Sequence, residues 1–125
     1  MLVVDDQVPF RQVAKTVIGL AAGFAVVGEA ESGENAVACA ADLHPDLVLM
    51  DINLPGINGI EATRRITATQ PGTVVVLLST YSAADLPDDA TSCGATAYVH
   101  KEDFGPGALR TLWDQRDRQE FGLAG

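Results

Sequence analysis

Short apolar runs alternate along the chain with longer segments of mixed polarity. The runs are rich in Val and Leu and contain no charged residue; they cover residues 2–4, 25–27, 47–50, 74–78 and 97–99. Uninterrupted apolar runs of this length are typical of strands that are buried on both faces of a parallel sheet. The pattern therefore predicts five parallel strands.

Five helices are predicted after these runs, most of them because apolar residues recur three and four positions apart. They cover approximately residues 10–21, 33–44, 59–69, 87–93 and 106–113. Gly23 ends the first helix, and Ser32 is the predicted N-cap of the second. The last helix is expected to point Leu109, Leu112 and Trp113 toward the core.

Strict alternation of strands and helices predicts one doubly wound α/β sheet with right-handed crossovers. The chain has 125 residues, of which 47% are hydrophobic, so it can bury a substantial core. No linker, repeat or low-complexity segment divides the alternation. We expect a single domain over residues 1–125.

The charge balance restricts the partners. Seventeen acidic residues stand against eight basic ones, and the formal net charge of -9 disfavours non-specific attraction to nucleic acid or to an anionic membrane. Cys39 and Cys93 have neither a CxxC nor a Cys/His spacing, so ordinary reduced thiols are expected. No secretory signal pattern opens the chain, and no apolar run approaches the ~20 residues of a membrane span. We expect a cytoplasmic protein whose partners are proteins or small ions.

Three carboxylates stand where apolar runs end. Asp5 and Asp6 follow the first run, and Asp51 follows the third. Open parallel sheets bind ligands at the carboxyl ends of their strands, so these side chains should meet there. Together they would repel one another and raise their own pKa values unless a cation lay between them. Mg²⁺ prefers oxygen ligands, which here would be Asp5 or Asp6, Asp51 and a backbone carbonyl just beyond it.

The same edge of the sheet receives a hydroxyl and an ammonium group, from Ser79 and Lys101. A carboxylate can attack phosphorus to form an aspartyl phosphate, and phosphoryl transfer needs in-line positioning and neutralised oxygens. Asp51 is the candidate nucleophile, with Mg²⁺ and Lys101 as cationic groups and Ser79 as a hydroxyl donor. Strand alternation directs His100 away from Lys101, so His100 is expected to be an ordinary surface residue.

Each of these residues also has a simpler interpretation. The aspartates could be strand-end or turn residues, and Lys101 could be a solvated surface lysine. Thr80 competes with Ser79 for the hydroxyl role. Tyr98 could be ordinary core packing. The gathering of several such residues at one edge favours a site.

Four segments resemble the receiver domain of bacterial two-component response regulators. They are residues 2–6 (LVVDD), 49–59 (LMDINLPGING), 77–79 (LLS) and 94–101 (GATAYVHK). They occur in the family's order, and the resemblance covers essentially the whole chain. It implies a flavodoxin-like (βα)5 fold with a five-stranded parallel sheet of order 2-1-3-4-5.

The resemblance also implies a role for each site residue. Asp51 would be the phosphoacceptor for a sensor histidine kinase. Mg²⁺ would be held by Asp5, Asp6, Asp51 and the backbone carbonyl of Asn53. The family's hydroxyl, aromatic switch and lysine positions fall on Ser79, Tyr98 and Lys101.

By this resemblance the chain is a phosphorylation-activated switch and not an enzyme beyond its own phosphorylation and dephosphorylation. The phosphoryl group would draw in Ser79 and Lys101, make space for Tyr98 to rotate, and change the surface of the fourth helix, fifth strand and fifth helix. That surface would control an output protein or form a homodimer. No direct binding of nucleic acid or membrane is expected.

Other functions remain open. The segments DINLP, GIEATRRI and KED are most similar to the subfamily usually fused to a LuxR-type helix-turn-helix, which is missing here. The chain is therefore either a stand-alone receiver or the receiver part of a longer DNA-binding regulator. A phosphorylation-independent docking scaffold is a further alternative. A phosphohydrolase would need an acid-base Asp where Asn53 stands.

Two departures from the family pattern concern the backbone. Glu102 follows Lys101 where the family usually has proline, often after a cis bond. A cis bond without proline costs about 2.5 to 4 kcal/mol, so we expect a trans bond and a different loop. The first strand begins at Met1, which leaves a shorter lead-in to Asp5 than is usual.

Tyr81, two residues after Ser79, is expected to cover an aspartyl phosphate and slow its hydrolysis. In Tyr81→Ala the half-life of phosphorylated Asp51 should therefore shorten, as measured by the loss of phosphoprotein after the phosphoryl donor is removed. An unchanged half-life would remove this role.

Overall fold

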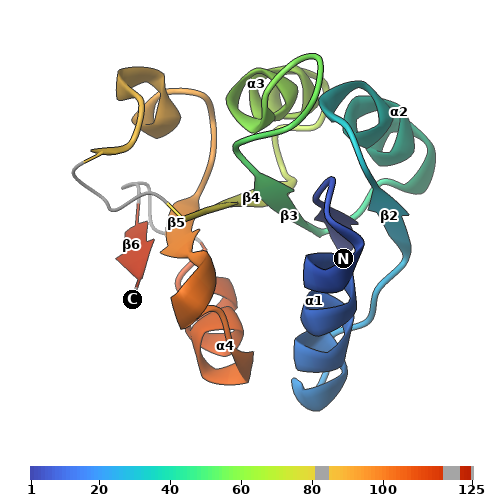
Figure 1. Ribbon diagram of the computed structural model, residues 1–125, viewed down its shortest axis with the longest axis vertical. Helices are drawn as coiled ribbons and strands as arrows, with labels where there is room; N and C mark the ends of the chain where they lie inside the picture. Colours follow the sequence, from blue (N-terminus) through green and yellow to red (C-terminus); the bar gives the residue numbers. More distant parts are fainter. Residues whose placement is uncertain (81–84, 117–121, 125) are drawn as a thin grey trace.

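The computed structural model describes residues 1–80 and 85–116 and the backbone of residues 122–124 (Figure 1). Its centre is a parallel sheet of order β2-β1-β3-β4-β5-β6. The strands are β1 (Leu2–Val4), β2 (Gly28–Ala30), β3 (Leu47–Asp51), β4 (Val74–Ser79), β5 (Ala97–His100) and β6 (Gly122–Ala124). The predicted order of five strands is confirmed. The sixth strand, β6, was not predicted; it lies along the edge of β5.

Helices cover both faces of the sheet. They are α1 (Val8–Leu20), α2 (Gly33–Leu43), α3 (Gly59–Thr69) and α4 (Pro106–Asp114), with the short 3-10 helices η2 (Asp88–Thr91) and η3 (Lys101–Asp103). Figure 1 shows α1 and α4 on one side of the sheet and α2 and α3 on the other. Because the side chains of each strand alternate between the faces, the chain builds two hydrophobic clusters, one on each side.

The central strands β3 and β4 are buried along their whole length. Met50 and Leu77 pack in the cluster under α2 and α3, whereas Leu49 and Val76 pack in the cluster under α1 and α4. Full burial of one such side chain stabilises a fold by about 1.5 to 3 kcal/mol. These two strands therefore give the sheet a rigid centre from which the last residue of β3, Asp51, projects.

The second strand was predicted at residues 25–27 and is found at Gly28–Ala30. The prediction was wrong because it followed the larger apolar residues, yet Val27 is 54% exposed. The strand instead begins with Gly28, which lets α2 approach closely. A methyl group on Gly28 would lie 2.7 Å from Leu43 Cδ1.

The predicted fourth helix over residues 87–93 is only a four-residue 3-10 helix, η2. Pro87 stands at its N-cap without a side-chain hydrogen bond, and Ala90 is its one buried residue. Helices in proteins are stabilised mainly by the packing of an apolar face, and this segment has too little apolar surface to stabilise a longer α-helix.

Capping explains why the starts of α2 and α3 were predicted accurately. The hydroxyl of Ser32 accepts a hydrogen bond from the Asn35 N–H at 3.1 Å, and Asn58 Oδ1 accepts one from the Glu61 N–H at 2.9 Å. The α3 helix accordingly covers Gly59–Thr69, as predicted.

Gly59 marks a close approach of α3 to the end of β3. Its N–H donates to the Ile52 carbonyl at 2.9 Å, and a methyl group at this position would collide with the backbone of Asp51. We expect Gly59→Ala to lower the free energy of unfolding by about 2 kcal/mol, because neither backbone segment can move without disturbing the core. Urea denaturation measures the change.

The matched control is Gly19→Ala in α1, where an added methyl group would contact nothing. It should leave stability unchanged or raise it by up to ~1 kcal/mol, since alanine favours the helix. Equal stability of Gly59→Ala and the unmodified protein would contradict the packing described here.

Candidate functional site

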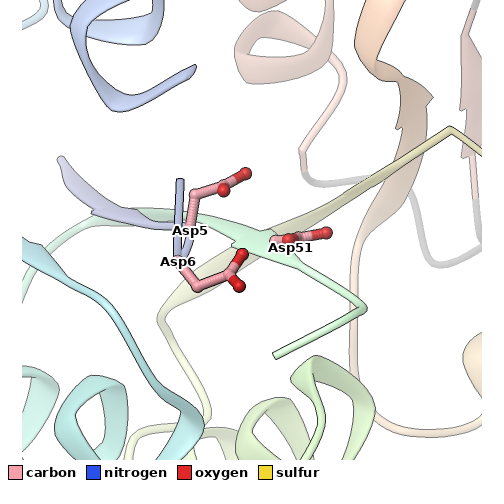
Figure 2. Close-up of side chains that lie close together, drawn as sticks. All are labelled: Asp5, Asp6 and Asp51. Atoms are coloured by element: carbon pink, nitrogen blue, oxygen red, sulfur yellow. The ribbon is translucent and has the colours of Figure 1, made fainter. Parts of the chain in front are cut away.

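Three carboxylates meet at the carboxyl ends of β1 and β3, as the sequence predicted. Asp5 and Asp51 are buried, and Asp6 is exposed. One oxygen of each side chain lies within 4.8 Å of the others. Figure 2 shows the three side chains at the ends of these neighbouring strands. Such a set of oxygen donors can hold a divalent metal ion.

Asp5 is fixed by hydrogen bonds on both carboxylate oxygens. Oδ1 accepts from the Gln7 N–H at 2.8 Å, and Oδ2 accepts from Lys101 Nζ at 2.7 Å. Its backbone carbonyl accepts from Arg11 Nη1 at 2.7 Å, while Arg11 Nε also bonds Glu29 at 3.1 Å. Hydrogen bonds from Gln7, Lys101 and Arg11 thus hold Asp5 and the turn between β1 and α1 in place.

Lys101 joins the end of β5 to this cluster. Its Nζ lies 2.7 Å from Asp5 and 3.6 Å from Asp51 Oδ2, so it bonds Asp5 directly and acts on Asp51 mainly as a nearby charge. The ammonium also lies over the ring of Phe10, 4.5 Å from its centroid. The Lys101 side chain is 16% exposed, and this aromatic contact confines it further.

Asp51 is electrostatically strained in this position. Its burial, followed by repulsion from Asp5, raises its pKa from 3.8 to about 6, against the opposing effects of Lys101 and the Asn53 N–H. That N–H donates to Asp51 Oδ1 at 3.3 Å. A single ammonium group therefore does not offset the three carboxylates. A cation bound among them would favour the ionised, nucleophilic form of Asp51.

Ser79 and Tyr98 lie beside this cluster on β4 and β5. Ser79 is the last residue of β4 and is 1% exposed. The hydroxyl of Tyr98 donates to the Ser79 carbonyl at 3.2 Å, and burial raises the pKa of that phenol. Tyr98 is 2% exposed, so its ring already occupies an inward position in this structure. Tyr81, the candidate for access control, lies outside the described residues.

Sequence reasoning missed the contacts that several residues make in and beside the site. Phe10 and Arg11 were expected only as parts of a helix, although they stand in the first turns after the acidic pair and so lie next to it. His100, expected as an ordinary surface residue, bonds both the Thr80 carbonyl and the Glu102 N–H. The Lys101–Glu102 bond is trans, as expected.

A family model described as the response regulator receiver domain matches residues 1–113. The transcriptional regulatory protein DegU of Brevibacillus brevis is 36% identical over 102 residues, which are 82% of this chain and 43% of DegU. The response regulator GacA of Pseudomonas aeruginosa is 38% identical over 101 residues, which are 81% of this chain and 47% of GacA. The chain thus spans less than half of either relative.

Among solved structures, a LuxR-family two-component response regulator from Aurantimonas sp. SI85-9A1 superposes with a TM-score of 0.84 and 29% identity. The superposition covers 96% of this chain and 86% of that one. Over the part of the chain that the structure describes, none of the helices has the length and apolar character to cross a bilayer.

The raised pKa of Asp51 predicts how stability depends on pH. Because the pKa is about 6 in the folded state and 3.8 without the fold, ionising Asp51 destabilises the folded protein, increasingly so from about pH 4 to pH 6. Without divalent ions, Asp51→Asn should therefore be more stable than the unmodified protein by about 3 kcal/mol at pH 7.5 and by about half of that at pH 5. Urea denaturation at both pH values provides the comparison.

Asp42→Asn, which removes an exposed carboxylate from α2, serves as the control. If both asparagine variants behave alike, Asp51 is not electrostatically strained.

Proposed function

The chain belongs to the response regulator receiver domain family, and we propose that it is a signalling switch whose Asp51 accepts a phosphoryl group from a sensor histidine kinase. The observation that carries this proposal is the position of Asp51. It stands at the end of a central strand, among two further carboxylates and 3.6 Å from an ammonium group. A nucleophile, metal ligands and a cation thus share one edge of the sheet.

Mg²⁺ is the proposed cofactor. Asp5, Asp6, Asp51 and the backbone carbonyl of Asn53 would hold it, and the geometry of the three carboxylates fits a hard cation. When bound, the ion would neutralise charge on the phosphoryl oxygens. Asp5 keeps its bond to Lys101 through one oxygen, and this leaves Asp6 and Asp51 as the less constrained ligands.

The remaining groups act on the phosphoryl group itself. A carboxylate oxygen of Asp51 forms the new bond to phosphorus while the bond from phosphorus to the donor breaks. Lys101 is close enough to Asp51 to attract the new dianion, and the Ser79 hydroxyl is the second donor. The chain needs no further catalytic group, so we propose that it acts as a switch and not as an enzyme on other substrates.

Phosphorylation would change the structure through Ser79 and Lys101. Movement of Ser79 toward the phosphoryl group would be transmitted to Tyr98, whose hydroxyl is bonded to the Ser79 carbonyl. The surface that responds is formed by η2, β5 and α4, which correspond to the fourth helix, fifth strand and fifth helix of the predicted order. This surface would bind an output protein or a second copy of the chain.

We propose that the chain is the receiver part of a longer DNA-binding regulator and not a stand-alone receiver, because it spans less than half of DegU and GacA. DNA binding would then belong to the remaining part. A phosphorylation-independent scaffold remains the alternative if Asp51 does not react. The two unpaired cysteines, Cys39 and Cys93, support a reducing, cytoplasmic location.

Incubation with acetyl phosphate and Mg²⁺ should add one phosphoryl group, about 80 Da, to the protein. Intact mass and Phos-tag electrophoresis measure the gain. It should require Mg²⁺ and be absent from Asp51→Ala. Asp42→Ala, which removes an exposed carboxylate from α2, should react like the unmodified protein.

An adduct that persists in Asp51→Ala would assign phosphorylation to another residue. If the folded, unmodified protein gains no phosphoryl group, the scaffold alternative replaces the switch.

A further inference from the structure

His100 connects the two strand ends that carry Ser79 and Lys101. It is the last residue of β5, directly before Lys101, and its register partner on β4 is Ser79. Its Nε2 lies 2.9 Å from the Thr80 carbonyl, and its Nδ1 lies 3.1 Å from the Glu102 nitrogen. One imidazole thus spans from the residue after Ser79 to the residue after Lys101.

The partners of His100 define which nitrogen carries the proton. A carbonyl oxygen only accepts, so Nε2 must donate to Thr80. A backbone N–H only donates, so Nδ1 must accept from Glu102. Both bonds form in a single species, the neutral imidazole with its proton on Nε2.

The second bond depends on a departure from the family pattern. Glu102 has a backbone N–H, whereas a proline at this position would have none to donate. Here the trans Lys101–Glu102 bond leads into η3, and the His100 side chain caps that short helix. The side chain thereby restrains the loop that begins with Lys101.

We propose that His100 is a positioning residue that sets the separation of the Ser79 hydroxyl and the Lys101 ammonium, by tying the end of β4 to the loop that follows β5. The inference rests on the proposed function, because its purpose is to hold these two groups ready for the phosphoryl oxygens. Recognition of a tetrahedral anion requires donors at a defined spacing, and loops that move independently would lower the fraction of molecules in the productive arrangement.

Two amide substitutions separate the hydrogen bonds of His100. The oxygen of asparagine can take the place of Nδ1, so His100→Asn keeps an acceptor for Glu102 and loses the bond to Thr80. The nitrogen of glutamine can take the place of Nε2, so His100→Gln keeps a donor for Thr80 and loses the acceptor. His100→Leu loses both bonds.

The rate of phosphorylation by acetyl phosphate at saturating Mg²⁺ should fall about fivefold in His100→Leu and about twofold in each amide variant. The affinity for beryllofluoride, a phosphoryl analogue, should fall in the same order. The affinity for Mg²⁺ alone, measured by calorimetry, should stay within about twofold in all three variants, since none of the metal ligands is changed. The amide variants should also keep the urea midpoint of the unmodified protein.

His44→Asn provides the matched control, because His44 caps α2 with a left-handed backbone that asparagine accepts. It should leave all four measurements unchanged. The inference is overturned if the His100 variants react at the rate of the unmodified protein, or if the amide variants lose as much rate as His100→Leu. It is also overturned if the loss of phosphorylation rate in each variant is accompanied by a matching loss of Mg²⁺ affinity or of stability. A wild-type protein that takes up no phosphoryl group would instead overturn the proposed function, and this inference with it.

Discussion

Two buried carboxylates, Asp5 and Asp51, face a single ammonium group, that of Lys101. This charge imbalance determines the chemistry at the end of the sheet where they lie. Burying a carboxylate is unfavourable unless it is paired, and Lys101 pairs closely with only one of the two. The backbone N–H groups of Gln7 and Asn53 supply part of the remaining stabilisation. The negative charge that these groups do not compensate makes Asp51 easy to protonate in the absence of a metal ion. The same charge favours the binding of a cation among the three carboxylates. The site therefore retains electrostatic strain that a bound ion can relieve.

The fold sustains this strain because the surrounding backbone has little freedom. β3 and β4 lie between two hydrophobic clusters, so the end of β3 cannot withdraw Asp51 toward water. Gly59 lets α3 press against the same strand end. On the opposite face, Arg11 holds the carbonyl of Asp5 from α1. α3 thus contributes to the site through its backbone, whereas α1 contributes the side chains of Phe10 and Arg11.

Much of the fold and of the site could be predicted from the sequence, because its strongest signals are local. Val- and Leu-rich runs define the central strands, Asn58 marks the start of α3, and strand-end aspartates meet wherever parallel strands are neighbours. β2 was misplaced because Gly28 and Ala30 have almost no hydrophobic signature; their role depends on how closely α2 packs. Residues 122–124 contain no periodic pattern, and their pairing with β5 is a tertiary event. The contacts of His100 likewise depend on the Thr80 and Glu102 backbone, which no side-chain pattern reveals.

The parallel pairing of β6 with β5 determines the direction in which this last strand of the described chain runs. α4 carries the chain to the amino ends of the strands, and β6 then runs back beside β5, with Ala124 opposite Val99. A polypeptide that continued past this strand would depart near the same edge as Asp51, not from the far end of α4. A module tethered there would pull on the outer edge of the sheet, which β5 and β4 separate from β3 and Asp51. A force on that module, or its docking elsewhere, would therefore act first on β5, to which β6 is paired.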